Sequence, residues 1–199
     1  MSTHSTLRIG LLVFDGVEEL DVVGPWEVLA SWARHSALHP EVMTFSADGS
    51  GVRCAKGLGL LPTTGADDVG PLTVLLHPGG AGTRPLMADA RHLAWVRAVR
   101  ATTPLMASVC TGSLVYAAAG LLAGRPATTH HAALDELAQA DPSVLIDAEA
   151  RFVDDGDVIT SAGVSAGIDM ALHLVARLDS PDAARAVRHG IQYDPDPPV

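Results

Sequence analysis

Cys110 is the side chain of this sequence best placed to act as a nucleophile. It stands in the string Ser108-Val109-Cys110-Thr111-Gly112, where an apolar run predicts a strand and the next residues predict a helix. Small residues two positions before and after a nucleophile are what a sharp strand-to-helix turn requires. A helix N-terminus would lower the thiol pKa and favour the reactive thiolate. The pattern alone leaves two hypotheses equally open, a catalytic cysteine and a buried, unreactive one.

Two other segments could assist such a nucleophile. Gly79 and Gly80 follow an apolar run and could present backbone N–H groups to a developing negative charge, although a tight turn is the simpler interpretation. Their loop lacks the lysine of a phosphate-binding P-loop. Asp21 lies between apolar residues before the pair Gly24-Pro25. It could handle protons, or it could be an exposed cap of the following helix.

Further motifs suggest other chemistry less strongly. Ser165 lies in a G-x-S-x-G string between a predicted strand and a predicted helix, but no later strand could carry the acid and histidine of a triad. His130 and His131 follow a predicted strand end, where open α/β sheets bind ligands, although a structural or partly exposed histidine pair is the simpler interpretation. No metal-binding motif is present, and the pair Asp169 and His173 favours a solvated helix face over a metal site.

Charge and composition restrict the class of partner. The 199 residues carry 23 acidic and 13 basic side chains, a net charge of −10, which argues against nucleic acid and anionic membranes. Small neutral molecules are the expected substrates. Two cysteines, Cys54 and Cys110, cannot form a disulfide framework, and no signal peptide is visible, so we expect a cytoplasmic protein. Residues 101–124 carry no charge, but their polar centre favours a buried strand and helix over a membrane span.

Strand and helix patterns alternate along the chain, which predicts one α/β domain over residues 1–199 with a mostly parallel central sheet covered by helices on both faces. The expected strands are Leu7–Phe14, Glu41–Ser46, Leu72–His77, Leu105–Val109 and short ones near 127–129, 144–146, 150–153 and 158–160. A hairpin is expected within Val52–Thr64. The expected helices are Gly24–Arg34, Arg84–Ala101, Thr111–Ala123, Val164–Leu178 and Pro181–Ile191. The tail Tyr193–Val199 should be loose or packed on the surface.

Four motifs together resemble the ThiJ/PfpI superfamily. They are Leu20-Asp21-Val22-Val23-Gly24-Pro25, His77-Pro78-Gly79-Gly80, Ser108-Val109-Cys110-Thr111-Gly112-Ser113 and Ala127-Thr128-Thr129-His130. Within the superfamily the pattern is most similar to the isocyanide hydratases, and it extends in order over nearly the whole chain.

The resemblance implies a flavodoxin-like α/β sandwich, a homodimer, no cofactor, and a cysteine on a strained elbow. It also implies the addition of water to a small-molecule isocyanide, giving an N-substituted formamide. Cys110 would form a thioimidate, Asp21 would manage protons, and Thr111 would position substrate or water. Gly79, Gly80, His130 and Val164 would bind the substrate.

Departures from the superfamily pattern bear on the other functions of its members. Peptidase-like members resemble one another in having His after the cysteine, where this chain has Thr111, and this difference disfavours protease or amidase activity. Glyoxalase-like members have Glu at the place of Asp21, so the shorter side chain argues against their activity, although His130 matches the histidine that they use. His77 stands where an apolar residue is expected. Sensor domains of AraC-type regulators also resemble this pattern, so a ligand- or redox-sensing protein is the alternative from another class.

Overall fold

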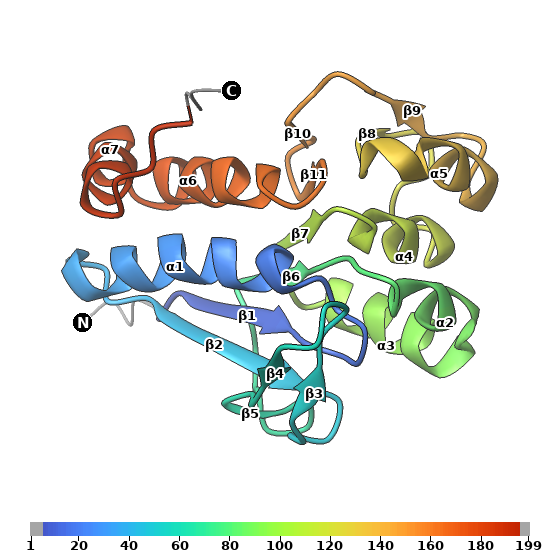
Figure 1. Ribbon diagram of the computed structural model, residues 1–199, viewed down its shortest axis with the longest axis horizontal. Helices are drawn as coiled ribbons and strands as arrows, with labels where there is room; N and C mark the ends of the chain where they lie inside the picture. Colours follow the sequence, from blue (N-terminus) through green and yellow to red (C-terminus); the bar gives the residue numbers. More distant parts are fainter. Residues whose placement is uncertain (1–5, 196–199) are drawn as a thin grey trace.

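A seven-stranded sheet organises the chain. The computed structural model describes residues 6–195, and within them the strand order is β10-β11-β7-β6-β1-β2-β5 (Figure 1). Every neighbouring pair is parallel except β10 and β11. The strands of this sheet are β1 (Arg8–Leu12), β2 (Glu41–Ser46), β5 (Thr64–Gly65), β6 (Val74–His77), β7 (Leu105–Val109), β10 (Phe152–Asp154) and β11 (Val158–Ser161). The expected α/β sandwich with a mostly parallel sheet is confirmed.

Helices cover both faces of the sheet. One face packs against α1 (Glu19–His35), α6 (Ala166–Leu178) and α7 (Pro181–Gly190). The other packs against α2 (Thr83–Ala88), α3 (Ala90–Arg100), α4 (Gly112–Ala118) and α5 (Leu134–Ala140). Figure 1 shows α1 and α6 side by side, although they come from opposite ends of the chain.

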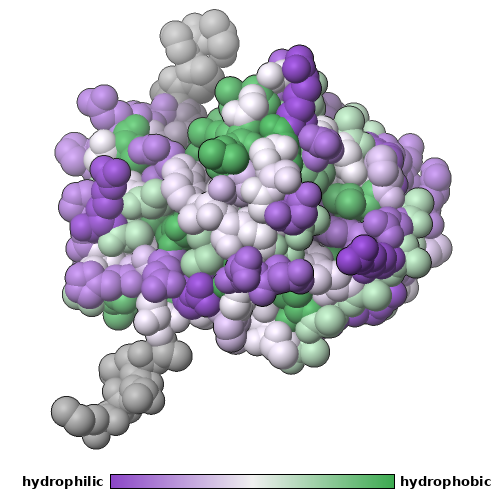
Figure 2. All heavy atoms as spheres, turned by 90° about the horizontal axis from the view of Figure 1, so that it is seen from below, coloured by the Kyte–Doolittle hydropathy of each residue, from purple (hydrophilic) through white to green (hydrophobic). Residues whose placement is uncertain are grey.

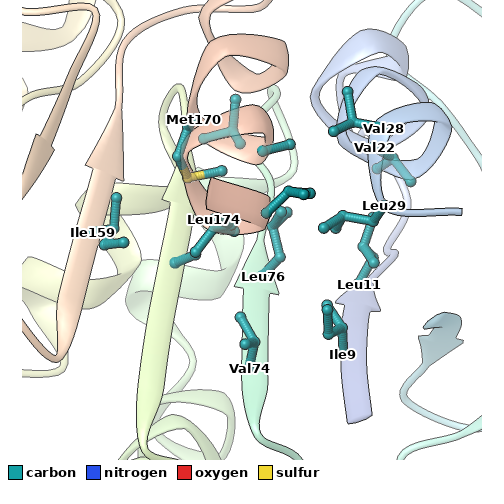
Figure 3. Close-up of a cluster of buried hydrophobic side chains, with 14 of the residues drawn as sticks. Ile9, Leu11, Val22, Val28, Leu29, Val74, Leu76, Ile159, Met170 and Leu174 are labelled. Carbon is teal, nitrogen blue, oxygen red and sulfur yellow. The ribbon is translucent and has the colours of Figure 1, made fainter. Parts of the chain in front are cut away.

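The two cores follow from the two-residue period of the strands. In β6, Val74 and Leu76 point to the α1 and α6 side, whereas Leu75 points to the other core. Figure 3 shows Val74 and Leu76 beside Ile9 and Leu11 of β1, beneath side chains of α1 and α6. Strands buried on both faces favour apolar side chains at successive positions, which explains the apolar runs of the sequence.

The first helix starts earlier than expected. We predicted Gly24–Arg34, but α1 begins at Glu19 and continues through Gly24 and Pro25. Gly24 allows α6 to approach, because a Cβ at this position would lie 2.9 Å from Ile168 Cγ1. The pair Gly24-Pro25 therefore marks a helix-to-helix contact and not a turn, and Asp21 lies in the first helical turn instead of a loop.

Other boundaries also differ from the predictions. The single helix expected over Arg84–Ala101 is broken at Asp89, which is extended and caps α3 by accepting the Arg91 N–H at 2.8 Å. The helix after Cys110 ends at Ala118, before Gly120 in the left-handed region, and not at Ala123.

The sequence analysis did not anticipate α5 and the turn η1 (His131–Ala133) before it. The short strands β8 (Pro126–Ala127) and β9 (Leu145–Ile146) form a separate parallel pair outside the main sheet. The expected hairpin is present as β3 (Val52–Arg53) and β4 (Gly59–Leu60).

The surface mixes charged and apolar side chains. Figure 2 shows the molecule from below the view of Figure 1, with hydrophilic side chains spread across the face and a smaller hydrophobic area. Leu61, which follows β4, is 83% exposed. Isolated exposed leucines are usual on protein surfaces and mark no site by themselves. Within residues 6–195, no helix is long and apolar enough to cross a membrane. Of the predicted tail, residues 196–199 lie outside the described part.

Candidate active site

Cys110 occupies a strained turn between β7 and α4. Its backbone lies in the left-handed region, with φ +56°, which residues with a side chain adopt uncommonly. The turn is held from two sides: the Cys110 N–H donates to Ser161 O at 3.0 Å, and Thr129 Oγ1 donates to Cys110 O at 2.9 Å. Gly112 is required because a Cβ there would overlap His77 O. The predicted strand-to-helix elbow is therefore present, with Cys110 at its tip.

Asp21 is fully buried beside the cysteine. Its Oδ2 accepts the Gly79 N–H at 2.9 Å, and its Oδ1 has no hydrogen-bond partner within residues 6–195. Asp21 and the Cys110 thiol lie close enough that each shifts the pKa of the other. Burial raises the pKa of Asp21 from 3.8 to about 7, so the carboxyl group exchanges a proton near neutral pH. The alternative of an exposed helix cap is wrong.

The thiol is not activated in the way the sequence suggested. Burial, followed by the negative charge of Asp21, raises the pKa of Cys110 to about 12. The backbone N–H groups of Thr111 and Val164 favour the thiolate but are outweighed. Because α4 has only seven residues, its N-terminus supplies a limited field. The expectation of a lowered thiol pKa is therefore wrong, and Cys110 needs a partner that accepts its proton.

The backbone N–H groups of Gly79 and Gly80 donate hydrogen bonds to other residues of the protein, whereas the sequence analysis expected them to bind substrate. The Gly79 N–H is taken by Asp21, and the Gly80 N–H donates to Thr111 Oγ1 at 2.9 Å. Thr83 extends this network by lying 3.1 Å from Thr111 Oγ1 and donating to Gly80 O at 2.7 Å. The loop thus positions Asp21 and Thr111, and the expectation that its N–H groups are free to stabilise a developing charge is not met.

Neither glycine of this loop tolerates a side chain. A Cβ on Gly79 would lie 2.5 Å from the Thr111 backbone nitrogen and 2.8 Å from Cys110 Cβ. Gly80 has φ +116°, and a Cβ there would overlap the Glu18 nitrogen. The Gly-Gly pair is therefore required by the close approach of three segments.

His130 and Val164 lie around the elbow. His130 Nδ1 accepts the Ala132 N–H at 3.2 Å, which assigns the ring proton to Nε2 in the neutral form. Burial lowers the pKa of His130 and favours that neutral form. Gly163 packs against the His130 ring, where any side chain would collide with it. Val164 has φ +52°, a strained value for a β-branched residue, and its N–H faces Cys110.

Ser165 belongs to a different arrangement. Its Oγ accepts from the Arg151 guanidinium at 3.4 Å, and Arg151 also forms an ion pair with Asp169. His173, which the sequence placed one helical turn after Asp169, pairs instead with Asp154 at 2.7 Å. Within residues 6–195, Ser165 has no histidine partner, so the G-x-S-x-G string marks the tight start of α6 and not a triad.

Sequence reasoning missed an ion pair beside Asp21. Glu18 pairs with Lys56, and Glu19 Oε1 accepts the Lys56 N–H at 2.7 Å, which fixes the loop between β3 and β4 against the start of α1. The negative charge of Glu18 raises the pKa of Asp21, and the positive charge of Lys56 lowers it. The adjacent acids in Glu18-Glu19 were visible in the sequence, but nothing local indicated that Lys56 would meet them.

Cys54 lies in the same loop and is buried like Cys110. Burial, followed by the charge of Glu19, raises its pKa. Among residues 6–195, no three His, Cys, Asp or Glu side chains lie close enough together to hold a metal ion.

The sheet topology, the cysteine at the β7–α4 elbow and the carboxyl group from α1 together define a class of α/β proteins that place a buried thiol at the carboxyl edge of the strands. The model of the DJ-1/PfpI family matches residues 7–177, and the chain belongs to this family.

Relatives cover both enzymes and regulators. The chain is 43% identical over 195 residues to the isonitrile hydratase of Pseudomonas putida, a match that covers 96% of this chain and 81% of that protein. A ThiJ/PfpI family protein from Pseudomonas syringae has a similar crystal structure, with a TM-score of 0.88 and 36% identity over 98% of this chain and 78% of that one. The HTH-type transcriptional regulator CdhR of Pseudomonas aeruginosa is 35% identical over 70% of this chain, which spans 41% of the regulator.

Proposed function

We propose that this protein adds water to isocyanides (isonitriles) and releases N-substituted formamides, with Cys110 as the nucleophile. The observation that carries the proposal is the buried pairing of Cys110 with Asp21, in a chain 43% identical to an isonitrile hydratase. A thiol and a carboxyl group that share the handling of one proton suit an addition in which sulfur and hydrogen both join one carbon.

The first step adds the thiol across the terminal isocyanide carbon. As the sulfur–carbon bond forms, the Asp21 carboxylate takes the thiol proton, and it then gives that proton to the same carbon, which leaves a neutral thioimidate on Cys110. This route removes the need for a free thiolate, which the raised pKa of Cys110 disfavours. A carboxyl group with a pKa of about 7 can both accept and return a proton near neutral pH.

The second step hydrolyses the thioimidate. Asp21 takes a proton from the attacking water as its oxygen bonds to the carbon, and it gives this proton to the imine nitrogen. The remaining hydroxyl proton of the tetrahedral intermediate then passes through Asp21 to the sulfur as the carbon–sulfur bond breaks, so the thiol is restored and the formamide leaves. Sulfur, oxygen and protons balance over the two steps, and the net change is the addition of one water molecule.

The remaining site residues position these groups. Thr111 Oγ1, held by the Gly80 N–H, would orient substrate or water, and Gly79 fixes Asp21. His130 and Val164, which lie around the elbow, would contact the substituent of the isocyanide.

The direct test is incubation of the pure protein with an aryl isocyanide while N-formamide formation is followed. Cys110→Ala should abolish turnover, whereas the matched variant Cys54→Ala, at the other buried cysteine, should keep it. The kcat/KM of the wild type should fall as the pH drops below about 7, because protonated Asp21 cannot accept the thiol proton. Turnover that survives in Cys110→Ala would exclude the proposed mechanism.

The similarity to CdhR supports a second candidate, a ligand- or redox-sensing protein. On that hypothesis the protein forms no formamide, while peroxide converts Cys110 to a sulfinic acid. A glyoxalase-like activity is a third candidate, since His130 matches the histidine of such relatives; it would appear as consumption of glyoxal or methylglyoxal without added cofactor.

We also propose that the protein acts as a homodimer in the cytoplasm. Leu20 and Val23 of α1 are 36% and 39% exposed one helical turn apart, beside the buried Asp21, and both cysteines are free thiols. Light scattering after gel filtration should give twice the monomer mass of 20.6 kDa.

A further inference from the structure

A cavity lies at the carboxyl edge of the sheet, away from Cys110, and has no part in the proposed chemistry. It measures about 560 Å³ and is bounded by the segments that follow β1, β2 and β5 and by α3. Cys110, Asp21 and Thr111 do not line it. Its volume is within the range of small-molecule sites, and the carboxyl ends of parallel strands are where α/β sheets bind ligands.

Three aromatic rings belong to the lining of this cavity. Phe14 follows β1, and His92 and Trp95 lie one helical turn apart on α3. The centroids of the His92 and Trp95 rings are 5.5 Å apart, and the centroids of Trp95 and Phe45 are 6.0 Å apart. Because neighbouring rings hold these side chains in place, the aromatic part of the lining needs little rearrangement to accept a ligand.

The charged residues of the cavity are predominantly acidic. Its lining contains one arginine, Arg91, and four aspartates, which are Asp15, Asp48, Asp67 and Asp89. Arg91 forms no ion pair with any residue from 6 to 195, and over the same range the Asp67 side chain accepts no hydrogen bond. Acidic groups around aromatic faces favour a cation, which gains from the carboxylates and from the π faces together.

Hydrogen bonds determine which ring nitrogen of His92 carries the proton and which one can accept a hydrogen bond. His77 Nδ1 lies 2.9 Å from Pro78 O, and a carbonyl oxygen can only accept, so the proton of the neutral His77 ring is on Nδ1. His77 Nε2 therefore accepts from His92 Nε2, 3.1 Å away, which leaves the Nδ1 of neutral His92 as an acceptor. A ligand with an N–H group can use such an acceptor, whereas one that only accepts hydrogen bonds cannot.

We propose that this cavity is a second ligand site, separate from Cys110, for a small primary or secondary organic ammonium ion that carries an apolar group. The apolar group lies against Phe14 and Trp95, the ammonium group faces the carboxylates, and an N–H donates to His92.

Calorimetric titration with benzylammonium at pH 7 tests the proposal. We expect saturable binding with a Kd of about 1 mM, an affinity appropriate to a ligand of this size. Benzyl alcohol, which has the ring without the charge, should bind at least about fivefold more weakly, and benzoate should not bind. Cys110→Ala should bind benzylammonium like the wild type, which separates this cavity from the proposed active site.

Two matched pairs of exposed residues locate the binding. Asp67→Asn should weaken binding about threefold, while Asp68→Asn, at the neighbouring carboxylate that does not line the cavity, should leave it unchanged. Arg91→Gln should strengthen binding about threefold, while Arg34→Gln, at an exposed arginine of α1, should not. Absence of saturable binding up to 10 mM (roughly tenfold above the expected Kd), equal binding of benzyl alcohol, or equal effects within either pair would overturn the proposal.

Discussion

Replacing Asp21 by Asn should change how the stability of the protein depends on pH. The Asn side chain keeps the shape and can still accept the Gly79 N–H, but it cannot ionise. In the wild type the folded protein holds the Asp21 proton with a pKa of about 7, whereas an unfolded chain holds it with a pKa near 3.8. The two values differ by about three pKa units, which at about 1.36 kcal/mol each corresponds to about 4 kcal/mol.

The sign follows from which state keeps the proton. At pH 4 and below, folded Asp21 is protonated and its burial costs little. As the pH rises towards 7, the unfolded chain loses this proton first, so the free energy of unfolding of the wild type falls by about 4 kcal/mol between pH 4 and pH 8 through this group. In Asp21→Asn this group cannot titrate, so its contribution to the free energy of unfolding does not fall with pH. The free energy of unfolding of the variant, relative to that of the wild type, should therefore be about 4 kcal/mol more favourable at pH 8 than at pH 4.

Urea denaturation of both proteins at pH 4, 6 and 8 measures this difference. Groups other than Asp21 titrate in both proteins and cancel when the two are compared at each pH. Asp67→Asn, which removes a carboxylate from the surface, controls for the change in net charge. A relative gain below about 1 kcal/mol would refute the conclusion that Asp21 is buried with a raised pKa, and with it the proposed proton transfer at neutral pH.

Three further substitutions test the packing and hydrogen bonds around the elbow. Gly79→Ala should lower the free energy of unfolding, measured by urea denaturation, by about 3 kcal/mol or more, because the new Cβ would lie 2.5 Å from the Thr111 nitrogen. Its control is Gly190→Ala, where no atom lies within 4 Å of the new Cβ. This variant should leave the free energy of unfolding unchanged or raise it by up to about 1 kcal/mol. Tyr116→Phe should cost about 1–2 kcal/mol in the same assay, since the buried hydroxyl donates to Ala107 O at 2.9 Å. Thr111→Val should slow formamide formation at least about tenfold by leaving the partly buried Gly80 N–H without its acceptor, and Thr111→Ser should stay within about threefold of the wild type.

Sequence periodicity predicted the central strands well because their burial on both faces leaves an unbroken apolar run. Glu41–Ser46 and Leu105–Val109 match β2 and β7 at both ends. The start of α1 was missed for the opposite reason: Gly24-Pro25 has a local preference for a turn, and only contact with Ile168 of α6 makes glycine necessary inside that helix.

The candidate site likewise has one part that the sequence could predict and another that it could not. Small residues around Cys110 and the Gly-Gly pair are local signals, and the sequence placed both at the carboxyl edge of the sheet. The depth of burial is not local: it depends on α1 and α6 closing over the elbow, and it raises the pKa of the thiol where a helix end alone would lower it. For the same reason the ion pair of Glu18 with Lys56 and the contact of His77 with His92 could not be predicted.

The packing of α1 against the end of the chain has a consequence for synthesis on the ribosome. Trp32 Nε1 donates to Asp179 Oδ2 at 2.8 Å, and these partners are 147 positions apart. At about 5–20 residues per second, α1 waits roughly 7–30 s before its partner residue has been made. During that interval Val28, Leu29 and Trp32, all buried in the finished protein, have no α6 or α7 to cover them. The segment that carries Asp21 is thus among the first to be synthesised and among the last to reach its final surroundings.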